Sequence, residues 1–196
     1  MFRWEDCVEG HIILGLTFSL ISSILLTLVT FSTPYNKSIY FLRTPNPSIH
    51  FGALGYCPST SECIKRVGYS TGSEVTEWLT RAQVLYAVGA IFMLLALIAL
   101  LLSLLRVGQF MWNPIYFRTM SLLGFIFSLL AEIFALILWV QARHRYDAEG
   151  VRATYGAALW IGLAGVILAF LAACFGGPAF EAKWMYRAHR NVPYNL

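Results

Sequence analysis

The stretch Thr119–Val140, TMSLLGFIFSLLAEIFALILWV, is apolar except for a single charged residue, Glu132. A helix needs roughly 20 predominantly apolar residues to cross the hydrocarbon core of a bilayer, and this stretch is long enough. Inside lipid, every backbone amide must find its hydrogen-bond partner within its own element. The sequence therefore predicts a transmembrane helix here.

Three further stretches are equally apolar and carry no charge: Ile12–Phe31, Leu85–Leu105 and Thr154–Phe175. Of all 196 residues, 58% are hydrophobic and only 12% are charged, whereas soluble domains carry about 25% charged residues. The mean hydropathy is +0.65. This composition excludes an ordinary cytosolic enzyme or nucleic-acid-binding module and predicts an integral membrane protein with four spans.

Basic residues predict how the chain is oriented in the membrane. An even number of spans places both termini and the connection between the second and third spans on one side. That side carries Arg3, Arg106, Arg118, Lys183, Arg187 and Arg190. Because cytoplasmic segments are enriched in Lys and Arg, we expect both termini in the cytoplasm and the loop 32–84 outside. We treat the chain 1–196 as a single membrane domain with a cytoplasmic tail over 176–196.

The loop 32–84 contains three short β-prone runs, separated by Pro and Gly: Ser38–Arg43, Ile49–Tyr56 and Ile64–Tyr69. Thr71 and Glu74 have the spacing of a capping box, which favours a short helix over Ser73–Val84. The predicted fold is an all-α transmembrane four-helix bundle with a small extracellular β-sheet built from this first loop.

Four cysteines divide between the two predicted sides. Cys57 and Cys63 lie in the exterior loop, where a disulfide is expected because that compartment is oxidising. The competing interpretation, a zinc site, has only His50 nearby and falls short of four ligands. Cys7 and Cys174 lie at cytoplasmic span ends, and are either candidates for S-palmitoylation or inert buried thiols.

One local motif in the loop resembles a known family. It comprises Phe51, Gly52, Gly55, Tyr56 and Cys57, followed by Cys63 and then by Gly68 and Tyr69. Together with four spans and cytoplasmic termini, this motif resembles the fungal PalI family of claudin-like membrane proteins. The resemblance implies a plasma-membrane protein that organises a lateral membrane domain or escorts a larger partner, without enzymatic activity.

Glu132 is the residue that departs most from its surroundings. An ionised carboxylate near the middle of a span costs at least about 2.5 kcal/mol, so a compensating interaction is expected. Glu132 lies one turn after Ser128 and on the face that carries Gly124 and Ala135. Three interpretations compete: a neutral acid bonded to Ser or Thr of the first span, a contact for a partner subunit, or a proton or cation site.

The predicted cytoplasmic rim is rich in aromatic and basic residues. An interfacial amphipathic segment on lipid and a docking surface for another protein explain this composition equally well. The residues concerned are Trp112, Tyr116, Trp184, Tyr186, Arg187 and Arg190. Small residues also recur at helical spacing in each span, and we expect them to pack the four helices against one another.

Two functions follow from these patterns. The first is a non-catalytic accessory or organising subunit, in contact with membrane lipids and with a larger membrane protein or other copies of the chain. The alternative is a component of ambient-pH or cell-surface stress sensing similar to PalI. A small transporter or membrane enzyme rests on Glu132 alone. The sequence offers no catalytic triad, no metal or cofactor motif and no nucleic-acid partner.

Overall fold

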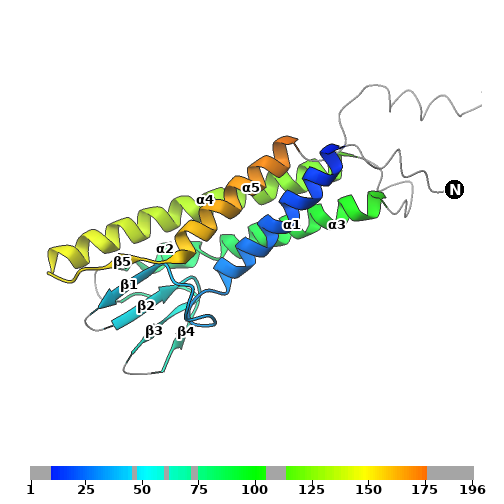
Figure 1. The fold of residues 1–196 in the computed structure, drawn as a ribbon. Coiled ribbons are helices and arrows are strands. Elements are labelled where there is room, and N and C mark those ends of the chain that lie inside the picture. Colours follow the sequence, from blue (N-terminus) through cyan, green and yellow to red (C-terminus); the bar gives the residue numbers. More distant parts are fainter. Residues whose placement is uncertain (1–9, 46–47, 60–61, 72–74, 105–113, 176–196) are drawn as a thin grey trace, which may run out of the picture.

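The computed structural model describes residues 10–45, 48–59, 62–71, 75–104 and 114–175. Its helices are α1 (Gly10–Thr30), α2 (Glu77–Ala82), α3 (Leu85–Leu104), α4 (Pro114–Ala148) and α5 (Ala157–Phe175). Its strands are β1 (Leu42–Pro45), β2 (Ser48–Gly52), β3 (Gly55–Pro58), β4 (Ile64–Lys65) and β5 (Thr154–Tyr155). The four long helices form a bundle, and the sheet lies at one end of it (Figure 1). We call this the sheet end.

Four helices of the described chain are long and apolar enough to cross a membrane: α1, α2 with α3, α4, and α5. The predicted number of spans, four, is therefore confirmed. Small residues let the helices approach closely, as expected. Gly89 and Gly124 lie at the contact of α3 with α4, and Gly165 lies against Leu26 of α1. The Ser22 hydroxyl of α1 donates to the Gly165 carbonyl at 2.9 Å.

Helix α4 is much longer than the predicted span Thr119–Val140. Its 35 residues extend roughly 50 Å at 1.5 Å per residue, well beyond the hydrocarbon core. Hydropathy alone missed the last turns because they are polar. Arg143, His144 and Arg145 therefore belong to the part of α4 that continues beyond the predicted span.

The sheet has the order β4-β3-β2-β1-β5, and its paired strands are all antiparallel. Two expectations were wrong here. The run Ile49–Tyr56 is a hairpin of β2 and β3, and not one strand. Thr154 does not begin the fourth span: it belongs to β5, which pairs with β1. The sheet therefore draws on both connections at this end of the bundle.

The short helix before α3 exists, with different bounds from those predicted. It begins at Glu77, and its N-cap residue is Thr76, so Thr71 does not cap it; Glu74 lies outside the described residues. Thr80 of α2 fixes the chain beyond β4, because its hydroxyl accepts from the Tyr69 amide and donates to the Tyr69 carbonyl. The loop therefore folds back onto the bundle.

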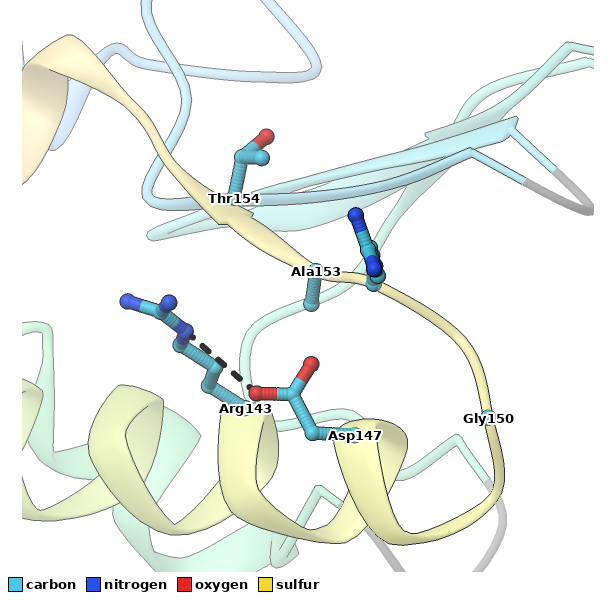
Figure 2. A pocket seen from close by; sticks show the side chains of 6 residues that line it. Arg143, Asp147, Gly150, Ala153 and Thr154 are labelled. Carbon is cyan, nitrogen blue, oxygen red and sulfur yellow. Dashed lines mark ion pairs between the residues drawn. The ribbon is translucent and has the colours of Figure 1, made fainter.

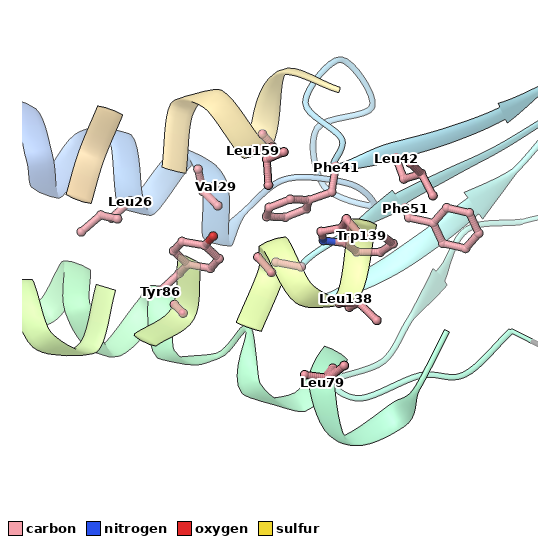
Figure 3. Packing of buried hydrophobic residues seen from close by; sticks show 14 of the residues in the cluster. Leu26, Val29, Phe41, Leu42, Phe51, Leu79, Tyr86, Leu138, Trp139 and Leu159 are labelled. Carbon is pink, nitrogen blue, oxygen red and sulfur yellow. The ribbon is translucent and has the colours of Figure 1, made fainter. Parts of the chain in front are cut away.

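Side chains from the sheet and the bundle form one continuous core (Figure 3). Phe41 directly precedes β1, Phe51 lies in β2, and Trp139 comes from α4; all three are fully buried. Their ring centroids lie 5.6 Å apart for Phe41 and Trp139, and 5.7 Å apart for Phe51 and Trp139. Aromatic pairs at these distances stabilise a structure by about 0.5–1.5 kcal/mol beyond area burial.

The predicted disulfide between Cys57 and Cys63 is confirmed. It joins β3 to the segment that leads into β4. Strands this short do not form a stable sheet alone, so the crosslink and the packing on α4 both support it.

We predict that Gly52→Ala strongly destabilises the protein. A Cβ at this position would lie 1.8 Å from the Thr33 carbonyl oxygen, a backbone atom that cannot rotate away. We expect a loss above about 3 kcal/mol, or failure to fold. The measurement is thermal unfolding in a mild detergent.

The control for this prediction is Gly150→Ala. Gly150 has a φ of 80°, and no atom within 4 Å of an added Cβ. Only backbone strain of about 1–2 kcal/mol is then expected. Equal unfolding temperatures for the two variants would contradict the steric argument.

Candidate functional site

The buried carboxyl of Glu132 lies at a junction of three helices. Its side chain is on α4, and the residue is only 2% exposed. The Tyr86 hydroxyl of α3 donates a hydrogen bond to Glu132 Oε2 at 2.7 Å. Gly162 of α5 covers the pair, because a Cβ there would lie 2.5 Å from Oε2 and 3.2 Å from the Tyr86 hydroxyl oxygen.

This geometry corrects the expected hydrogen-bond partner. One of the three interpretations predicted a bond to Ser or Thr of the first span, whereas the partner is Tyr86 of α3. Ser128 is buried as well, but its hydroxyl donates to the Phe125 carbonyl of its own helix at 3.0 Å. Tyr86 was missed because it lies 46 residues before Glu132, on a different helix.

Several buried polar atoms near the sheet end of the bundle have no hydrogen-bond partner among the described residues: Gln83 Nε2 and Oε1, Glu132 Oε1 and Trp139 Nε1. Such atoms cost about 1–3 kcal/mol each unless water fills the gap. A neutral carboxyl at Glu132 keeps this cost lowest, because an ionised one would lack a second donor.

Six aromatic rings connect the sheet to this junction, and we call them the aromatic column: Tyr56, Tyr69, Phe51, Trp139, Phe41 and Tyr86. Neighbouring centroids along it lie between 5.3 and 6.5 Å apart. Figure 3 shows Phe51, Trp139, Phe41 and Tyr86 following one another from sheet to bundle.

The predicted family motif supplies the three rings of the aromatic column on the side of the sheet. Phe51, Tyr56 and Tyr69 pack together, and the Tyr69 hydroxyl donates to the Gly52 carbonyl at 2.6 Å. Burial raises the pKa of Tyr69 well above its usual value, so the hydroxyl remains a donor at physiological pH. Gly55, at φ 149°, and Gly68, at φ 72°, adopt backbone conformations that side chains disfavour.

Large apolar side chains are exposed just after α1 and in and after β4, the edge strand of the sheet. We call them the edge patch: Phe31, Tyr35, Ile64 and Val67. These are the large hydrophobic side chains outside helices that are exposed in the described chain, by 42% to 56%. The Phe31 and Tyr35 rings lie 5.7 Å apart, and Lys65 Nζ lies 5.2 Å from the Tyr35 ring centroid.

The remaining predicted residues are not brought into a common site. Tyr116 lies in the first turn of α4, partly exposed, and Cys174 near the end of α5 is exposed with a free thiol. The other predicted rim and tail residues lie outside the described residues: Cys7, Trp112, Trp184, Tyr186, Arg187 and Arg190. Over the part of the chain that the structure describes, no three His, Cys, Asp or Glu side chains converge as metal ligands.

Four apolar helices with a disulfide-linked antiparallel sheet at one end define a multi-pass membrane protein with a claudin-like fold. A family model, described as the SUR7/PalI family, matches residues 11–172. The chain belongs to the SUR7/PalI family, which confirms the resemblance seen in its loop motif. A comparison with curated proteins finds no match.

We predict that Tyr86→Phe lowers the free energy of unfolding by about 1–2 kcal/mol, because it removes the donor to a buried carboxyl oxygen. The measurement is equilibrium unfolding in mild detergent. Ser128→Ala is the control, since it removes a buried hydroxyl bonded only within its own helix, and we expect a change within about 0.5 kcal/mol. Equal losses would show that the interhelical bond contributes nothing.

Proposed function

We propose that this chain is a non-catalytic accessory or organising subunit of the plasma membrane. In this proposal the sheet faces the exterior, both termini are cytoplasmic, and the whole chain acts as one membrane domain. Its proposed partner is a larger integral membrane protein. A second copy of the chain is the alternative partner within the same proposal. The edge patch is the observation that carries the proposal.

The position of the edge patch supports lateral binding. Phe31 directly follows α1, which ends at Thr30, so the patch begins where the lipid-covered helix surface stops. A partner spanning the same membrane would cover both surfaces together. Exposed large apolar side chains that gather outside the long helices are typical of interaction sites.

The strand beside the patch also supports a partner. β4 is two residues long and stands at one edge of the sheet. An edge strand leaves backbone groups unpaired, and another chain is able to satisfy them. Lys65 lies over the Tyr35 ring, where a cation both limits uncontrolled association and offers a contact for an acidic group.

We predict that Val67→Asp reduces partner recovery about tenfold, because it places a charge in the centre of an apolar contact. The experiment is purification from the native membrane in mild detergent under reversible crosslinking, with quantification of each recovered protein. A large membrane protein at fixed ratio identifies an accessory subunit. Recovery of the chain's own oligomers identifies a scaffold built from copies.

Ser70→Asp is the matched control, because Ser70 is exposed, lies three residues away and already bears a polar side chain. Partner recovery with this variant should equal that of the unaltered protein. Equal recovery with Val67→Asp would contradict the proposed role of the patch. Recovery of lipid alone from all three proteins would contradict the proposed partner.

The aromatic column supports the second candidate function, a component that senses ambient pH or cell-surface stress. Packed rings transmit a displacement better than a flexible linker does, because interiors are dense and resist compression. A change at Tyr56 or Tyr69 would therefore reach the Tyr86–Glu132 pair. This route gives an exterior sheet a physical means of altering helix packing inside the membrane.

We predict that Phe41→Leu abolishes a pH- or stress-dependent response of cells while the protein still reaches the surface. Phe41 is the ring between Trp139 and Tyr86. The control is Phe92→Leu, since Phe92 stacks on Phe127 outside the column. The measurement is a response reporter at equal surface abundance. Equal responses for both variants would contradict sensing through the column.

A further inference from the structure

A pocket of about 440 Å³ opens at the sheet end, between the last turns of α4 and the chain leading into β5. It is lined by Arg143, Asp147, Gly150, Arg152, Ala153 and Thr154. Figure 2 shows the strand-side residues passing over the end of the helix. The pocket is separate from the Tyr86–Glu132 junction and from the edge patch.

The backbone holds the two walls of this pocket together. The Val151 amide donates to the Tyr146 carbonyl at 2.9 Å, and the Gly150 amide donates to the Asp147 carbonyl at 3.1 Å. With Gly150 at φ 80°, these bonds form a Schellman motif, which ends the helix and reverses the chain. β5 then pairs with β1, so the opposite wall is fixed to the sheet.

The pocket gathers more positive than negative charge. Two guanidinium groups, Arg143 and Arg152, line it with a single carboxylate, Asp147. Arg143 contacts Asp147 through Nε at 3.6 Å, and Figure 2 shows its terminal nitrogens on the side away from Asp147. The Arg143 guanidinium carbon lies 4.7 Å from the Tyr155 ring centroid, which limits its motion.

Arg152 has no such support. It is exposed, and no ion pair involves it within the described ranges. Two arginines that line one pocket offer several charged N–H donors to an anion. A bound anion would satisfy donors on both walls at once.

The position of the pocket along the bundle axis indicates which anions are nearby. Exposed apolar side chains on α4 continue to Val140, and Arg143 follows about 4.5 Å further along the axis. Trp160, in the first turn of α5, is 63% exposed, as is typical of a side chain at the membrane interface. Arg143, on the helix side of the pocket, therefore lies close to the end of the apolar surface, where phospholipid phosphates are expected.

We propose that this pocket binds a phosphate group, with Arg143 and Arg152 as its cationic contacts. The guanidinium group presents paired N–H donors that match phosphate oxygens. The same chemistry is offered by a phosphomonoester lipid headgroup in the adjacent leaflet and by free phosphate. Asp147 orients Arg143 and keeps the site selective for a ligand able to accept from both arginines.

The experiment measures thermal unfolding of the whole purified chain in a non-ionic detergent. One arm adds inorganic phosphate against sodium chloride at equal ionic strength, which separates binding from screening. The other arm adds dioleoyl phosphatidic acid against dioleoyl phosphatidylcholine to the micelles. We expect the unfolding midpoint to rise in at least one arm. A rise with phosphatidic acid alone identifies the lipid as the source.

The decisive variant is Arg152→Gln, which removes an exposed side chain without an ion pair and should leave the midpoint without ligand unchanged. We expect the phosphate group to bind about tenfold more weakly, because one charge-assisted hydrogen bond is lost. Arg66→Gln is the matched control, because it removes the same charge beyond β4, at the opposite edge of the sheet. It should bind as the unaltered protein does.

Two results would overturn the proposal. One is an unchanged midpoint of the unaltered protein in both arms. The other is an equal loss of binding in Arg152→Gln and Arg66→Gln, which would indicate general surface charge. Arg143→Gln provides an independent check on the other wall, and retained full binding in that variant would also overturn the assignment.

Discussion

The contact of Phe41 and Phe51 with Trp139 is the interaction on which the other features depend. Strands of two to five residues do not form a stable sheet in water, so this sheet requires the bundle beneath it. Trp139 supplies that support because α4 places its ring between the two phenylalanines. Without this contact, neither the close approach at Gly52 nor the position of Tyr86 below Phe41 would be fixed.

Helix α4 joins three chemically different environments along one axis. Glu132 lies inside the bundle, Trp139 lies beneath the sheet, and Arg143 lines the pocket near the polar end of the helix. Because a helix is stiff over this distance, a displacement at one level is transmitted to the others. The sheet, the helix junction at Glu132 and the pocket are therefore physically linked through α4.

Much of the fold was predictable because its determinants are local. Bilayer thickness sets the length of an apolar run, which located all four spans, and the paired cysteines of one loop indicated the disulfide. The candidate site was predictable only in part. Glu132 was conspicuous as an isolated charge, but its partner Tyr86 lies 46 residues away, and sequence spacing carries no signal for a contact between different helices.

The sequence by itself determined that the chain spans a membrane four times, that one loop carries a crosslinked β-rich unit, and to which family the chain belongs. These properties follow from composition and short-range pattern. Only the tertiary structure decided that β5 completes the sheet, that α4 continues as a polar helix beneath it, and that Arg143 and Arg152 line one pocket. Each of these depends on contacts between distant segments, whose energy arises only once the bundle has formed.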